Sequence, residues 1–170
     1  MTMHALGKIC VFLLLLCGMY HIAPYQVWAW TAEVLSVSDG DSFKIRQGKR
    51  IIKVRLYGID SPEYGQPYWR AARTEARGWL KGIVEIEPMY KDRYGRTVAL
   101  VWSEGRLVNA ALVQSGMAWV YPRFCRSREL CQHMETLQQA ARQARLGLWQ
   151  DEKPEPPWQW KRRQGRGRRP

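Results

Sequence analysis

The feature that most limits the possible fold is a series of five short segments with the apolar patterns of β-strands. They occupy residues 31–38, 42–47, 51–59, 84–90 and 96–102. The first two alternate apolar and polar residues around an Asp-Gly-Asp turn, and a Gly-Lys-Arg turn separates the second from the third. Such turns join antiparallel strands into hairpins. The spacing therefore predicts a strand-rich domain.

Helical periodicity appears at three places around these strands. A helix opened by Pro67 is expected to present one apolar face formed by Trp69, Ala72, Ala76, Trp79 and Ile83. A second helix is expected over 107–114, ending at Gly116. A third has apolar residues at alternating steps of four and three, namely Leu130, Met134, Leu137, Ala141, Ala144 and Leu148. We therefore predict an α+β, mainly β fold: a five-stranded OB-fold barrel with three helices, over residues 30–149.

The first 29 residues differ from the rest and resemble an export signal. Lys8 precedes the apolar run ICVFLLLLCGMY, and Val27 and Ala29 suit the positions before a signal-peptidase cut. We expect residues 1–29 to be a signal peptide, cleaved after Ala29, and the mature chain to be secreted or periplasmic. The alternative is an uncleaved membrane anchor running from residue 9 to residue 30.

The chain is strongly basic, and its end is the most basic part. Lys and Arg total 27 against 15 acidic residues, a formal charge of +12. Such a surface attracts polyanions, although charge alone also suits a merely soluble protein or an anionic membrane. Residues 150–170 are rich in proline and then arginine, without apolar periodicity, and are expected to be a basic disordered tail.

Removal of the leader would leave two cysteines, Cys125 and Cys131, in a loop that enters the third helix. In an oxidising compartment this pair is expected to form a disulfide. A metal site is the weaker alternative, because His133 is then the sole histidine. A lone histidine also excludes paired-histidine nucleases and phospholipases.

Five charged residues lie where the predicted strands begin or end. Asp41 precedes the second strand, Arg55 belongs to the third, Asp60 and Glu63 follow it, and Arg96 begins the last. Neighbouring strand ends lie close together in an antiparallel barrel, so the two aspartates are expected to share a hard cation such as Ca²⁺. The arginines would clamp a phosphate, and Glu63 would be the base for the attacking water. Taken singly, most of these residues would equally suit solvated turns.

Five stretches together resemble the thermonuclease, or staphylococcal nuclease-like, family. They are DGDS at residue 39, VRLYGIDSPE at 54, KDRYGR at 91, LVNAALVQSGMAWVY at 107 and ARLGLW at 144. The resemblance covers Trp30 to Trp149 and implies an OB-fold, Ca²⁺-dependent endonuclease acting on DNA and RNA, single-stranded or denatured, as a monomer. Ser42 stands where the family usually has threonine, which keeps the hydroxyl.

The resemblance also implies roles for individual residues. Asp41 and Asp60 would bind the metal together with the backbone carbonyl of Ser61. The catalytic residues would be Arg55, Glu63 and Arg96, and the residues flanking the bound nucleotide would be Tyr94 and Tyr121. The competing hypothesis is a non-catalytic OB-fold module that binds single strands without cutting them.

Overall fold

The structure is a computed structural model that describes residues 29–166. Its elements, in chain order, are β1 (Trp30–Val37), β2 (Ser42–Gln47), β3 (Arg50–Leu56), β4 (Ile59–Asp60), α1 (Trp69–Trp79), β5 (Ile83–Lys91), β6 (Thr97–Ser103), β7 (Arg106–Leu107), α2 (Val108–Gln114), β8 (Trp119–Val120), α3 (Arg128–Gln143), the 3-10 helix η1 (Gly147–Gln150) and α4 (Pro157–Arg166). The expected signal peptide lies almost wholly outside the described residues. None of the helices within 29–166 is both long and apolar enough to span a bilayer.

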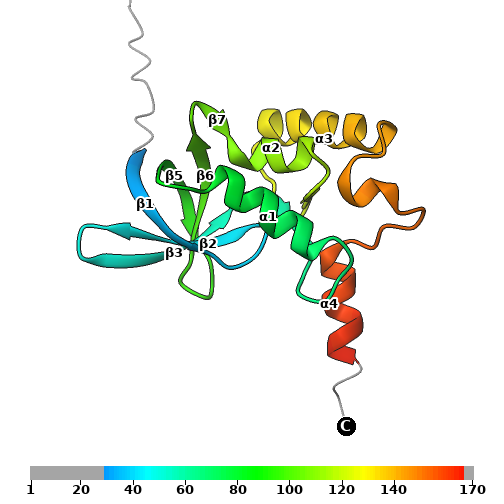
Figure 1. Ribbon diagram of the computed structural model, residues 1–170, viewed down its shortest axis with the longest axis horizontal. Helices are drawn as coiled ribbons and strands as arrows, with labels where there is room; N and C mark the ends of the chain where they lie inside the picture. The colour runs from blue at the N-terminus through cyan, green and yellow to red at the C-terminus, as the bar shows by residue number, and fades with distance from the viewer. Residues whose placement is uncertain (1–28, 167–170) are drawn as a thin grey trace, which may run out of the picture.

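Five strands close into a barrel. β1 pairs antiparallel with β2 and β5, β2 with β3, and β5 with β6, and a parallel pairing of β3 with β6 completes the ring. Figure 1 shows α1 and the pair α2 and α3 on one side of these strands. The predicted five-stranded OB-type barrel is confirmed.

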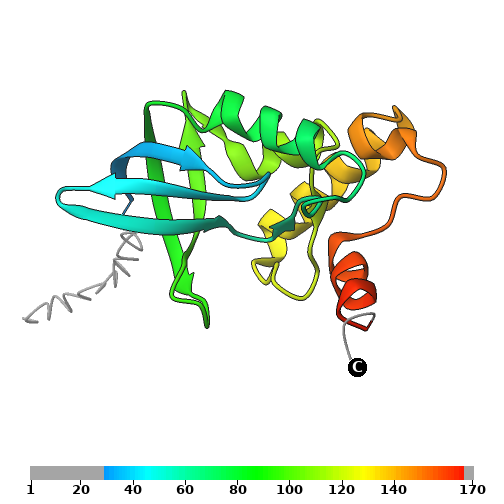
Figure 2. The same ribbon diagram turned by 60° about the horizontal axis from the view of Figure 1, so that its bottom comes forward.

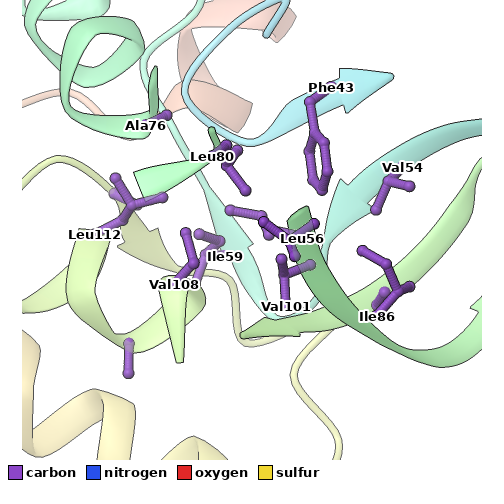
Figure 3. Packing of buried hydrophobic residues seen from close by; sticks show 14 of the residues in the cluster. Phe43, Val54, Leu56, Ile59, Ala76, Leu80, Ile86, Val101, Val108 and Leu112 are labelled. Atoms are coloured by element: carbon purple, nitrogen blue, oxygen red, sulfur yellow. The ribbon is translucent and has the colours of Figure 1, made fainter. Parts of the chain in front are cut away.

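The barrel interior is filled by alternating residues of each strand. Phe43, Val54, Ile86 and Val101 are buried in one cluster, and Figure 3 shows them converging from four strands. The cluster continues into the layer between barrel and helices, where Leu112 of α2 is fully buried. This packing fixes the strand ends from which the charged residues project.

Two helix boundaries differ from the prediction. The third helix, α3, ends at Gln143, so that Ala144 lies at its C-cap and Leu148 in η1. The first helix ends before Ile83. The helical period suggested that Ile83 lies on the same face as Ala76, but α1 ends at Trp79 and Ile83 begins β5, where it is 63% exposed. Gly82 has a φ of +61°, which turns the chain into the strand. Ile83 therefore matches the helical spacing only by coincidence, because it belongs to the strand that follows the helix.

The expectation of disorder for 150–170 is also wrong over much of that range. Gln150 ends η1, and Pro157–Arg166 forms the fourth helix, α4. In Figures 1 and 2 this helix, in red, stands beyond the helical side of the domain, and Figure 1 places it beside the loop that leads into α1. Pro157 occupies the first helical position, where a missing N–H costs nothing.

The predicted disulfide is present: Cys125 and Cys131 are bonded, with their Cα atoms 5.8 Å apart. The bond closes the loop before α3. The Tyr57 hydroxyl accepts hydrogen bonds from the backbone N–H groups of Arg126 and Ser127 in the same loop. The loop is therefore held by the disulfide and by hydrogen bonds to Tyr57, a buried residue that directly follows β3.

Asn109 of α2 joins three backbone segments inside the protein. Its Oδ1 accepts from the N–H of Val101 at 3.0 Å, and its Nδ2 donates to the carbonyls of Tyr57 at 3.0 Å and Ala99 at 3.2 Å. The side chain is fully buried. It therefore ties α2 to β6 and to the segment between Arg55 and Asp60.

Replacing Asn109 with leucine is expected to lower the free energy of unfolding by about 2–3 kcal/mol, because buried backbone groups lose their partners. Urea denaturation would measure the change. Gln114→Leu, at an exposed position of the same helix, should stay within about 0.5 kcal/mol of wild type. Equal midpoints for the two variants would contradict the proposed structural role.

Candidate active site

Asp41 is fixed by the turn between β1 and β2. Its N–H donates to the Asp39 carboxylate at 3.0 Å, and its Oδ2 accepts from the Ser61 N–H at 2.8 Å. A Cβ on Gly40 would lie 2.7 Å from the Ser61 Cβ, so glycine allows this close approach. The turn and the Ser61 segment are thereby held side by side.

Arg55, near the end of β3, bridges two buried carboxylates. Its Nη1 donates to Asp41 Oδ1 at 2.8 Å, and its Nη2 donates to Asp60 Oδ1 at 2.5 Å. The aspartates are 2% and 0% exposed, so the guanidinium is their main countercharge. A charged side chain inside an apolar strand thus has its partners, as the sequence required.

One arginine does not balance the acidic groups around it. Burial and the charge of Asp41 raise the pKa of Asp39 to about 7. Burial and the same charge raise the pKa of Asp60 to about 6, against the opposing charge of Arg55. Burial also disfavours ionised Asp41, but the charge of Arg55 and the Ser61 N–H bring its pKa below the usual value. The cluster is therefore short of positive charge.

Glu63 lies just beyond this cluster, on the loop before α1. Its N–H donates to Gln66 Oε1 at 3.0 Å, which fixes the loop. Its carboxylate is partly exposed and forms an ion pair with Lys161 of α4, at 2.6 Å between Oε1 and Nζ. The same ammonium is 3.4 Å from Asp60 Oδ1. Burial disfavours the charged lysine, but Asp60 and Glu63 raise its pKa.

Arg96 and Tyr94 lie on the turn between β5 and β6. Arg96 Nε donates to Asp92 at 2.7 Å, and its guanidinium lies 5.5 Å from the centre of the Tyr94 ring. Thr97, the next residue, pairs with Val54, the neighbour of Arg55. Within the described residues no hydrogen bond or ion pair joins Arg96 to Arg55 or Glu63. The structure thus places Arg96 at the end of the turn, directly before β6, with its guanidinium bonded to Asp92.

Tyr94 is 66% exposed and is one of the residues that line an open groove of about 860 Å³. Basic and aromatic side chains line this groove, namely Arg50, Lys53, Tyr90, Lys91 and Tyr94. Bases stack on aromatic rings while cationic side chains contact phosphates, so this combination suits a single strand of nucleic acid.

Tyr121, expected to flank a nucleotide, follows β8. Its ring stacks on Trp158 of α4, with centroids 4.7 Å apart and an interplanar angle of 6°. Phe124 contacts it edge-on at 4.9 Å. One face of Tyr121 is therefore already occupied by an aromatic ring of the same chain.

The donors suit a hard cation that retains water ligands. Within residues 29–166 no three His, Cys, Asp or Glu side chains converge on one metal position. Asp60 Oδ2, however, is buried and accepts no hydrogen bond from any described residue. Oxygen donors from Asp41, Asp60 and the Ser61 carbonyl, combined with the deficit of positive charge, fit Ca²⁺ better than a softer metal.

The comparisons with known proteins decide the family. The model for "Staphylococcal nuclease homologue" matches residues 53–151. The chain belongs to the staphylococcal nuclease family. The resemblance inferred from the sequence stretches is thereby confirmed.

Several relatives match most of the chain. Protein ParB of Escherichia coli is 38% identical over 147 residues, which is 79% of this chain and 82% of the relative. An uncharacterized endonuclease of Escherichia coli O157:H7 is 36% identical over 132 residues, covering 76% and 84%. Micrococcal nuclease of Shigella flexneri is 34% identical over 152 residues, covering 83% and 86%. This member of the staphylococcal nuclease family thus aligns with most of the length of these three relatives.

Sequence reasoning missed two residues at the site, Trp158 and Lys161. The signal available was Pro157, which favours a helix start, followed by apolar and basic residues. The segment has too few apolar residues to show a periodic pattern. Its position is set by contacts with residues far away in the chain, which the sequence pattern does not show.

Proposed function

We propose that this chain is a Ca²⁺-dependent nuclease that hydrolyses phosphodiester bonds in DNA and RNA. Membership of the staphylococcal nuclease family makes it a nuclease; the metal, the substrate range and the residue roles are the proposal. The observation that supports it best is the bridge of Arg55 between buried Asp41 and Asp60, close to Glu63. A structural salt bridge would need neither the second carboxylate nor an Asp60 oxygen without a hydrogen-bond partner among residues 29–166.

Asp41, Asp60 and the Ser61 carbonyl would hold the cation. When bound, Ca²⁺ supplies a Lewis acid that polarises a phosphoryl oxygen and offsets negative charge that develops in the transition state. The two carboxylates are held in place before it binds, Asp41 by Ser61 N–H and Asp60 by Arg55. The site is therefore largely preorganised.

Glu63 is proposed to take the proton from the attacking water. Its side chain is partly exposed, unlike those of Asp41 and Asp60, so water and substrate can reach it. Arg55 has five N–H donors, and its two strongest contacts leave others for a phosphate oxygen. Arg96 would contact the same phosphate after exchanging its bond to Asp92, and the two arginines would stabilise the added negative charge.

The substrate is proposed to be single-stranded or denatured nucleic acid, bound by a monomer. The supporting features are the groove containing Tyr90 and Tyr94 and the formal charge of +12. The disulfide suits an oxidising compartment, which supports export to the periplasm or the medium. Retention on the membrane by an uncleaved leader is the alternative.

Hydrolysis of denatured DNA is expected to require Ca²⁺, with Mg²⁺ a poor substitute. Few protein ligands and an irregular donor set suit Ca²⁺, whereas Mg²⁺ demands near-ideal octahedral geometry. Release of acid-soluble nucleotides would be measured in Ca²⁺, in Mg²⁺ and in chelator. Equal turnover in both metals, or full turnover in chelator, would contradict the roles given to Asp41 and Asp60. Binding without cleavage in Ca²⁺ would instead support the non-catalytic module.

A further inference from the structure

The C-terminal helix α4 contacts the candidate active site at two separate points. Lys161 reaches the acidic cluster, and Trp158 reaches Tyr121. Asp60 and Lys161 are 101 positions apart in the chain, so the contact is a product of the fold and not of local sequence. The first contact involves residues with roles in the proposed function, and the second involves Tyr121, which the family resemblance places beside the nucleotide.

The first contact places a positive charge among the carboxylates. The Lys161 ammonium pairs with Glu63 at 2.6 Å and with Asp60 at 3.4 Å. A divalent cation bound to Asp60 would lie close to this ammonium, and like charges repel strongly where the surroundings are partly buried. A general base engaged by an ammonium is also less available to accept a proton from water. Lys161 thus opposes both cation binding at Asp60 and proton transfer to Glu63.

The second contact fills the surface expected to flank the nucleotide. Trp158 lies parallel to Tyr121, in the geometry by which a nucleic acid base stacks on an aromatic ring. Trp158 also meets Trp119 edge-on, with centroids 5.8 Å apart. A base that stacks on the same face of Tyr121 must therefore displace the indole.

The attachment of α4 is specific but small. Gln66, in the loop before α1, donates to the carbonyl of Glu155 at 2.7 Å. Pro157 is buried, whereas the Lys161 side chain is 45% exposed. Figure 1 shows the helix joined to the domain by a single connection and not enclosed by other elements. Release of α4 would thus leave the barrel core intact.

We propose that α4 competes with the ligands of the active site: Lys161 with the cation at Asp60, and Trp158 with a nucleic acid base at Tyr121. The proposal rests on the proposed function and adds to it an element, α4, that sets the affinity of the site for the cation and for nucleic acid. Because coupling between two binding events is reciprocal, α4 lowers cation affinity by the same factor by which the cation weakens the attachment of α4. The full chain is then most active where cation and strand are both plentiful.

The decisive experiment measures Ca²⁺ binding to the full chain by calorimetry, without nucleic acid. Lys161→Met is expected to bind Ca²⁺ at least about fivefold more tightly than wild type, the lower end of usual coupling factors. Arg162→Met is the matched control: it removes one charge at the next position, which is exposed and bonds within α4 to the Trp158 carbonyl. Equal affinities for wild type and both variants, or weaker binding by Lys161→Met, would overturn the competition.

A second measurement follows the helix itself. Trypsin cleavage after Lys161 and Arg162 in the wild-type chain should accelerate when Ca²⁺ is added, and further with a short oligonucleotide, because α4 is then released. Trp158→Ala should show fast cleavage without either ligand. This variant also tests the proposal if Lys161→Met does not fold. Cleavage that slows in Ca²⁺ would contradict the proposal.

Kinetics separate this inference from the proposed function. Lys161→Met should raise turnover at subsaturating Ca²⁺ and match wild type at saturation. A Lys161→Met enzyme with kcat reduced at saturating Ca²⁺ would show that Lys161 assists the reaction and would overturn competition. If the wild-type chain showed no Ca²⁺-dependent turnover, the proposed nuclease mechanism would be refuted instead, whatever the binding data show.

Discussion

Glu63→Gln is expected to lower kcat by about 10²- to 10⁴-fold, the usual contribution of a general base, while the fold is retained. Glutamine has nearly the same shape and can still accept a hydrogen bond from Lys161, but it cannot take a proton from water. The carboxylate is on a loop at the surface of the cluster, so its loss leaves no buried charge behind. Initial rates on denatured DNA at saturating Ca²⁺ would measure the effect.

The control for this variant is Glu85→Gln, an exposed position on β5, which should retain wild-type kcat. Circular dichroism and the thermal midpoint should be similar for both proteins. If Glu63→Gln retained full kcat with normal spectra, Glu63 would not be the base, and the binding-module hypothesis would gain support.

Arg55→Met is expected to abolish detectable turnover and to lower the free energy of unfolding at neutral pH by about 3–5 kcal/mol, the usual cost of removing one member of a buried ion pair. Asp41 and Asp60 would remain buried without their main countercharge. Lys161, at 3.4 Å from Asp60 and partly exposed, compensates little. Urea denaturation in chelator would measure the loss without a contribution from bound cation.

Two further variants make this prediction specific. The triple variant Arg55→Met, Asp41→Asn, Asp60→Asn should recover most of the lost stability, because no uncompensated charge remains. Arg46→Met breaks a half-exposed pair with Glu33, and should cost at most about 1 kcal/mol. If Arg55→Met and Arg46→Met had the same small effect, the bridge would not be important for stability.

The barrel was predictable because its signals are local. Alternation in 42–47 places Phe43 and Ile45 on one face, and the turns on either side permit hairpin pairing with both neighbours. The acidic cluster was predictable for a related reason. Asp41 and Asp60 lie at strand ends, and the closed barrel brings those ends together; an arginine within an apolar strand requires acidic partners.

The position of α4 could not be predicted from local patterns. A helix with so many charged residues has little intrinsic reason to pack, and its placement comes from Trp158 on Tyr121 and from Gln66 on Glu155. The assignment of Ile83 to a helical face was wrong because the period alone does not show where Gly82 turns the chain. The motif placed Arg96 at the start of the last strand, but β6 begins one residue later, at Thr97, and the bond of Arg96 to Asp92 depends on the turn geometry.

The short connection between η1 and α4 has a quantitative consequence. Segment 151–156 contains two prolines and begins where η1 is packed on the domain. A tethered group of this kind is present near its target at an effective concentration in the millimolar range, whatever the protein concentration. The same helix supplied as a free peptide would therefore need to reach millimolar levels to act equally, and dilution of the enzyme would never relieve the competition.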